Sequence, residues 1–218
     1  MTSSNPIDVR DMAIVHRSFR RAFTEAAQLV RAKPTPSPGR VTFLADHVDF
    51  GVLMLHTHHE GEDELLYPLL AQRAPERLAD VDRIEAQHRT VTGAVDAASA
   101  ACAAWRADPS PATAETLAAR LDDVNDVLQP HLDDEEQVIV PLAADHLTQK
   151  EWDALGDHGV ASVPRNKRPL AFGMLTEGLD DSDSAHMKAH LPAPIRLLYP
   201  VLIDRPWRKY ADTLRNGS

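Results

Sequence analysis

The chain of 218 residues is poor in sulfur and in aromatic residues, with a single cysteine, Cys102, and 5% Phe, Trp and Tyr. One cysteine excludes an internal disulfide and any cluster of thiolate ligands, and it favours a reducing compartment. No apolar run approaches the length of a membrane span, and the chain does not open on a basic stretch followed by an apolar run. We therefore expect a cytoplasmic protein with no membrane partner.

Positive charge is also scarce, since the formal net charge is −10 at pH 7. A phosphate backbone requires a basic surface, so nucleic acid is not expected as a partner. No segment alternates apolar and polar residues over a convincing length, whereas alanine and leucine are plentiful. The composition therefore predicts an all-α fold, with one main domain and an extension.

The segment 56–69, HTHHEGEDELLYPL, places imidazoles and carboxylates four residues apart within an apolar pattern. Residues at this spacing share one face of a helix. On a helical wheel His58 and Glu62 lie inside the apolar stripe, whereas His59 and Asp63 fall at its edge. These two are expected to be outer or solvated groups, although a reorganised site could recruit one of them. A buried imidazole beside a buried carboxylate is costly unless something such as a metal ion compensates both.

The same pattern recurs in the segment 131–142, HLDDEEQVIVPL. His131 and Glu135 repeat the spacing of the earlier pair, and in both segments a proline follows the glutamate by six residues. Both residues again lie inside an apolar stripe, whereas Glu136 falls outside it and is expected to face solvent. The repeat predicts two helices that each point one histidine and one glutamate into the core.

Helical periodicity predicts long helices over about 8–32, 40–73 and 75–107 and a fourth from 113, joined by short proline-rich turns. Such helices indicate an up-down-up-down four-helix bundle. The stripe of the first helix contains His16 and that of the third contains His88. Glu85, three residues before His88, stays open between a ligand, a hydrogen-bond partner and a surface acid. The inward residues form a ligand set for two metal ions: His16, His58, Glu62, His88, His131 and Glu135.

A capping box of Thr148 and Glu151 predicts a further short helix that ends near Gly156. We therefore expect a bundle domain over 1–158, with a frayed end at 1–6, and an extension over 159–218. The extension has nine basic and six acidic residues, so its charge favours docking onto the acidic bundle. Two arrangements stay open: short helices that cover one end of the bundle, or a surface through which two chains dimerise.

The order of a lone histidine, H-x-x-x-E, a second lone histidine and H-x-x-x-E resembles the hemerythrin-like family, the HHE cation-binding domain, over about residues 8–146. The resemblance implies a non-haem di-iron centre bridged by the two carboxylates, with an open position for dioxygen, peroxide, nitric oxide or azide. Two iron ions are the expected cofactor, although manganese or zinc also suits a set of nitrogen and oxygen donors.

Dioxygen-carrying hemerythrins have a second histidine one turn after the third-helix ligand, where this chain has Thr92. This departure would leave one iron with fewer protein ligands, open to solvent or to a substitute such as Glu85. Peroxide or nitric-oxide chemistry, including catalase- or peroxidase-like turnover, is then more expected than reversible oxygen carriage. The alternatives are an iron or oxygen sensor without turnover and a metal-free helical interaction protein.

Overall fold

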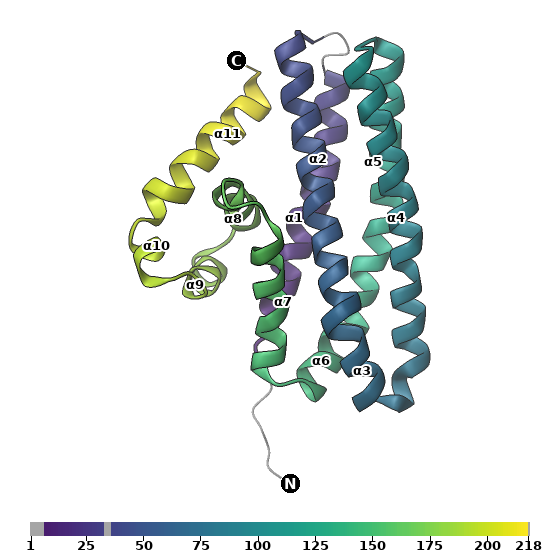
Figure 1. Ribbon diagram of the computed structural model, residues 1–218, viewed down its shortest axis with the longest axis vertical. Coiled ribbons are helices and arrows are strands. Elements are labelled where there is room, and N and C mark those ends of the chain that lie inside the picture. The colour runs from purple at the N-terminus through teal and green to yellow at the C-terminus, as the bar shows by residue number, and fades with distance from the viewer. Residues whose placement is uncertain (1–6, 33–35, 218) are drawn as a thin grey trace.

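The computed structural model describes residues 7–32 and 36–217, which form helices and no strand; the expected frayed end at 1–6 lies outside them. Four long helices lie side by side (Figure 1), in a ring in which the first contacts the second and the last, and the third contacts the same two. Their apolar stripes therefore meet in a shared core. The helices are α1 (Arg10–Ala32), α2 (Pro38–Gly61), α4 (Leu78–Ala107) and α5 (Pro111–Asp134).

Polar caps and prolines define where α2 and α5 begin. The Ser37 hydroxyl accepts a hydrogen bond from the Arg40 N–H, and Ser110 and Thr113 form a reciprocal capping box at the start of α5. Proline follows each capping serine, at the position where a missing N–H costs nothing. A short 3₁₀ turn, η2 (Pro75–Arg77), leads into α4. The helix starts thus follow from local sequence.

The two helices that carry the repeated pattern each open into a π turn that begins at the glutamate. These turns are η1 (Glu62–Leu66), continued by α3 (Tyr67–Arg73), and η3 (Glu135–Ile139), continued by α6 (Val140–His146). Pro68 and Pro141 lie at the start of the continuing helices. A proline lacks an N–H and its ring crowds the carbonyl four residues earlier, so the helix widens just before it. Pro130, in contrast, lies inside α5, which runs through it unbroken.

Buried apolar residues form two clusters, one toward each end of the bundle. Phe19 and Leu55 belong to one cluster, and Leu66 and Ile84 belong to the other. The repeated His and Glu residues lie in the sequence between members of these two clusters. They therefore occupy a polar layer with apolar packing on both sides.

The segment after α6 is helical and lies along the flank formed by α1 and α2 (Figure 1). The capping box of Thr148 and Glu151 is confirmed, but the helix that it starts ends at Ser162, so the expected end near Gly156 is wrong. None of the described helices is both long enough and apolar enough to cross a membrane. The elements are α7 (Gln149–Ser162), α8 (Arg168–Thr176), α9 (Asp181–Ala189), α10 (Ala193–Leu197), η4 (Pro200–Asp204) and α11 (Arg205–Asn216).

The extension is anchored to α2 through α11. The Arg40 guanidinium donates to the carbonyl oxygens of Thr213 and Leu214, at 2.8 and 2.5 Å, at the end of α11. His47 Nδ1 lies 3.0 Å from the Tyr210 hydroxyl, and the His47 ring is buried. Charged and aromatic contacts therefore hold this part of the extension on the bundle.

Candidate metal centre

The polar layer brings seven possible metal-ligating side chains together from the four long helices and the two π turns. They fall into two groups, and within each group one donor atom of every side chain lies within 4.8 Å of the others. All are buried except His58, which is partly buried. The first group is His16, His58, Glu62 and Glu135, and the second is His59, His88 and His131.

The first group lies between α1, α2 and α5. His16 Nε2 and His58 Nε2 are 3.3 Å apart. His58 Nε2 lies 3.3 Å from Glu62 Oε1, and His16 Nε2 lies 3.5 Å from Glu135 Oε2. Two ligands at right angles on one ion, each about 2.1 Å from it, are about 3 Å apart. These separations therefore suit donors that converge on one cation.

The second group lies between α2, α4 and α5 and borders the same two carboxylates. The rings of His59 and His88 stack with their centroids 4.0 Å apart. His88 Nε2 lies 3.6 Å from Glu62 Oε2 and 3.8 Å from Glu135 Oε1, and His131 Nε2 lies 3.4 Å from Glu135 Oε2. Each glutamate therefore lies beside both groups, as a carboxylate that bridges two ions must.

Several of these atoms are buried without any hydrogen-bond partner. They are His59 Nε2, His131 Nε2, both carboxylate oxygens of Glu62, and Glu135 Oε2. An unpartnered buried polar atom costs about 1–3 kcal/mol, and more when it is charged. Five such atoms in one layer would destabilise the core, and a pair of cations would compensate them. The residues present therefore fit a two-metal centre.

Carboxylates on the outer side orient the two lone histidines. His16 Nδ1 lies 3.0 Å from Glu136 Oε1, and His88 Nδ1 lies 2.7 Å from Asp63 Oδ1. A hydrogen bond at one ring nitrogen fixes the tautomer and leaves the other nitrogen free to bind a metal. The expectation that Glu136 faces solvent is wrong, because it contacts His16 from the neighbouring helix.

The histidine of α5 has an amide partner instead. His131 Nδ1 lies 3.1 Å from Gln87 Oε1, and the Gln87 amide donates to Asp134 at 2.8 Å. Arg83 donates to the same Asp134 carboxylate at 2.6 Å. This chain of contacts holds His131 with its Nε2 toward the centre.

Burial keeps most of these imidazoles neutral. Desolvation lowers the pKa of His58 and His59 well below the usual value, and it lowers the pKa of His131 to about 4. Desolvation likewise raises the pKa of the Glu62 carboxyl, and the nearby Glu135 adds to the effect. Neutral imidazole is the form that binds metals. The layer therefore offers neutral donors in His58, His59 and His131, whereas contacts with Glu135 and Asp63 raise the pKa of His88 against the effect of burial. A cation would favour ionisation of the Glu62 carboxyl.

A tyrosine closes the layer on the side of η1. The buried Tyr67 hydroxyl donates to Glu135 Oε1 and lies 3.5 Å from His88 Nε2. Tyr67 is the first residue of α3, and its backbone N–H bonds the Glu62 carbonyl across the π turn. The π turn thus positions a phenol against the carboxylate of the opposite helix.

All six residues of the expected ligand set lie together in this layer: His16, His58, Glu62, His88, His131 and Glu135. The sequence interpretation missed His59, which is buried and belongs to the second group rather than being an outer or solvated residue. Its signal was its place directly after His58. An ideal wheel, however, assigns His59 to the edge of the stripe. Glu85 is exposed, and Thr92 lies in neither group.

Comparison with known proteins gives one family. No curated protein and no solved structure matches the chain significantly. The family model of the hemerythrin HHE cation-binding domain matches residues 8–143, which include α1, α2, α4, α5 and the whole polar layer. This span is more than half of the 218 residues. The chain therefore belongs to the hemerythrin HHE cation-binding domain family.

Proposed function

We propose that this protein holds two non-haem iron ions in the polar layer and binds a small oxygen or nitrogen species there, namely dioxygen, peroxide or nitric oxide. The observation that carries the proposal is that Glu62 and Glu135, which belong to the first donor group, also lie within 3.4 to 3.8 Å of histidines of the second group. Five histidines and two carboxylates are available to the two ions. Their unpartnered donor atoms support metal binding over a purely structural polar core.

Iron is the proposed metal because the donors are nitrogen and oxygen without sulfur and because a redox-active ion gives an open position a use. Manganese and zinc would accept the same donors, and availability in the cell decides among them. When bound, iron would supply electron transfer and a coordination position for the small ligand. The residues of the chain hold the ions, neutralise their charge and exclude bulk water with the apolar clusters on both sides.

His59 changes the ligand count that the resemblance implies. Thr92 occupies the position where dioxygen-carrying hemerythrins have a fifth histidine, and we infer that His59 on α2 supplies this donor instead. Its Nε2 is buried and unpartnered, and its ring stacks on His88. Glu85 does not supply the substitute, because its side chain is exposed. The second ion would then have three histidines, so Thr92 would not by itself leave that ion more open than in dioxygen-carrying hemerythrins.

Peroxide turnover is the enzymatic form of this proposal. No described side chain near the layer is an obvious nucleophile, so the ions would perform the chemistry while the chain sets their geometry. The test is oxygen release from hydrogen peroxide by iron-loaded protein. We expect Glu62→Ala and Glu135→Ala to abolish it and His56→Ala, on the same helix as His58 but outside both donor groups, to preserve it. Turnover that survives both glutamate substitutions would contradict the enzymatic form.

A sensor without turnover is a second candidate, supported by the contact between α7 and the start of η1. Gly61 precedes Glu62 and lies against the His158 ring, where an added Cβ would be 3.2 Å from His158 Cδ2. A shift of Glu62 on metal loss would therefore reach α7. Limited proteolysis of the extension with and without iron tests this candidate, which predicts faster cleavage of the metal-free protein. Equal cleavage rates would count against it.

The finer architecture belongs to the same proposal. We infer an up-down-up-down bundle as the unit over 1–158 and an accessory role for 159–218, in a cytoplasmic protein whose buried Cys102 stays reduced. The rival, a metal-free helical interaction protein, predicts a folded chain that purifies without metal. Elemental analysis separates the two accounts.

A further inference from the structure

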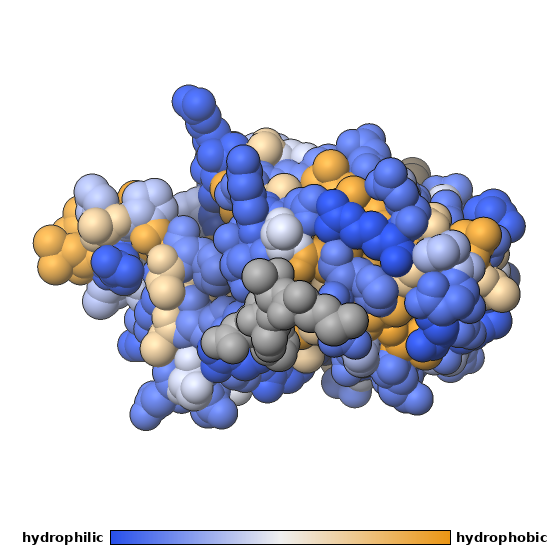
Figure 2. Space-filling model, turned by 90° about the horizontal axis from the view of Figure 1, so that it is seen from below, coloured by the Kyte–Doolittle hydropathy of each residue, from blue (hydrophilic) through white to orange (hydrophobic). Residues whose placement is uncertain are grey.

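The outer end of the extension exposes large apolar side chains. Leu197 is 81% exposed and Val201 61%, and Leu198 and Leu202 are exposed beside them. In Figure 1, α10 lies at the edge of the molecule farthest from the bundle, and Figure 2 shows an apolar group projecting at the same end. We call residues 192–209 the tip. Apolar side chains gathered on a projection indicate a surface that is covered in use.

The tip is also basic. Every exposed residue in it is either apolar or basic, and its acid Asp204 is half-buried and lies 3.7 Å from Arg208. With four basic residues and one acid, the tip carries +3 in a chain of net charge −10, so the remainder carries −13. The exposed basic residues are Arg196, Arg205, Arg208 and Lys209.

Other side chains already pack the inner face of the tip, so the exposed apolar residues have no room to turn inward. Tyr199, Ile203 and Trp207 are buried. The Tyr199 hydroxyl lies 2.8 Å from the Thr176 hydroxyl. Trp207 packs so closely on Gly173 that an added Cβ there would be 2.5 Å from Trp207 Cβ. The exposed leucines and valine are therefore an outward face and not a loosely packed part of the core.

We propose that the tip docks on an anionic lipid surface, with Leu197, Leu198 and Val201 in the headgroup region and the basic side chains on lipid phosphates. Apolar side chains bordered by lysine and arginine are the composition that binds such interfaces. The contact is peripheral and requires no spanning helix, but it departs from the sequence expectation of no membrane partner. Association of the tip with the tip of a second copy is disfavoured, because it would bring two +3 surfaces together. The metal centre takes no part in this binding.

The test is co-sedimentation of the full chain with vesicles of phosphatidylcholine alone and of phosphatidylcholine with phosphatidylglycerol. We expect binding to the anionic vesicles that weakens with added salt. Replacing both Leu197 and Val201 with serine should weaken it at least about tenfold, because each loses buried hydrocarbon. Val160→Ser is the matched control, since Val160 on α7 is 55% exposed but lies outside the tip.

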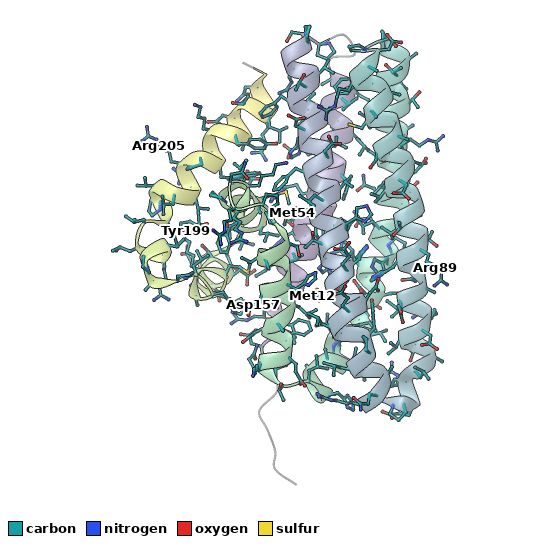
Figure 3. All side chains as sticks on the ribbon, in the orientation of Figure 1. Met12, Met54, Arg89, Asp157, Tyr199 and Arg205 are labelled. Carbon is teal, nitrogen blue, oxygen red and sulfur yellow. The ribbon has the colours of Figure 1, made fainter. Side chains whose placement is uncertain are left out.

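A charge variant tests the basic component separately. Replacing both Arg205 and Arg208 with glutamine should also weaken binding at least about tenfold. Arg89→Gln is the control, because Arg89 is an exposed residue of α4 on the opposite side of the molecule from Arg205 (Figure 3). Unchanged thermal unfolding shows that a variant is folded. If the apolar variant does not fold, the charge variant decides.

Three results would overturn the proposal. One is no binding to anionic vesicles, or equal binding to neutral ones. Another is an equal loss in tip and control variants. The third is a dimer in sedimentation velocity that the tip substitutions dissociate while vesicle binding stays absent, which would assign the tip to a second copy of the chain.

Discussion

The two halves of the candidate metal centre, α2 with η1 and α5 with η3, are built alike. Each half supplies a histidine, a glutamate four residues later and a π turn that starts at this glutamate. The next acid in each half, Asp63 or Glu136, orients the lone histidine of a neighbouring helix. One local pattern therefore yields both a pair of candidate ligands and the partner of a third candidate.

The halves differ at several positions, and two of these differences bear on the layer and on the elements beside it. Where α2 has His59, α5 has Leu132, which packs in the apolar core. Where α2 has Gly61, against which His158 packs, α5 has Asp134, which holds Gln87. The repeat sets the shared donors, and the added residues adapt each half to the element beside it.

The largest expected effect comes from removing the shared carboxylates. Glu62→Ala and Glu135→Ala should each reduce the iron content from about two ions per chain toward zero, because each glutamate borders both donor groups. Elemental analysis after gel filtration measures this. Glu60→Ala, an exposed neighbour, serves as the control. Retention of both ions in either glutamate variant would show that the halves do not share their carboxylates.

His59→Leu makes α2 resemble α5 and tests the first difference directly. It should leave the second group with two histidines and reduce the iron content from about two to about one ion per chain. His56→Leu controls for loss of a histidine on the same helix. Two firmly bound ions in His59→Leu would mean that His59 only packs on His88.

Asp63 and Glu136 occupy equivalent positions in the two halves, and replacing either should have a smaller effect on metal binding. Glu136→Gln and Asp63→Asn should each weaken metal affinity by about 10–100-fold, because each acid orients a ligating imidazole. Glu136 should matter more, since it is 32% exposed against 46% for Asp63 and also contacts Arg20. Competition with a chelator measures the affinity. Asp126→Asn, at an exposed position of α5, is the control. An unchanged affinity in both variants would remove the orienting role.

A buried histidine of α2 that lies outside the polar layer provides a contrast. His47 bonds Tyr210, and burial lowers its pKa to about 4. Between about pH 6.5 and 4 the unfolded chain binds a proton at this residue that the folded chain does not, so stability should fall as the pH falls through this window. The contribution is up to about 3 kcal/mol.

Thermal unfolding of the metal-free protein at pH 7 and pH 5 checks this expectation. His47→Gln should lose less stability on acidification than the parent, and His190→Gln, at an exposed position, should behave as the parent does. An identical pH dependence in the parent and His47→Gln would contradict the assignment.

Helical periodicity was sufficient to predict the helices and the six inward residues, because a ligand in a core must replace an apolar residue in the stripe. It was not sufficient for His59 and Glu136. Both lie at or beyond the edge of their own stripe, and their roles depend on which neighbouring helix lies beside that edge. The course of the extension was also unpredictable, since its contacts, such as that of Trp207 on Gly173, join segments without a shared periodicity.

The most direct test of the account is the number of iron ions bound per chain, measured by elemental analysis of the full-length protein loaded with ferrous iron without oxygen and freed of excess metal. The account predicts about two ions per chain, removable only by a strong chelator. A folded protein that retains no metal, or one ion unaffected by replacement of Glu62 or Glu135, would contradict it.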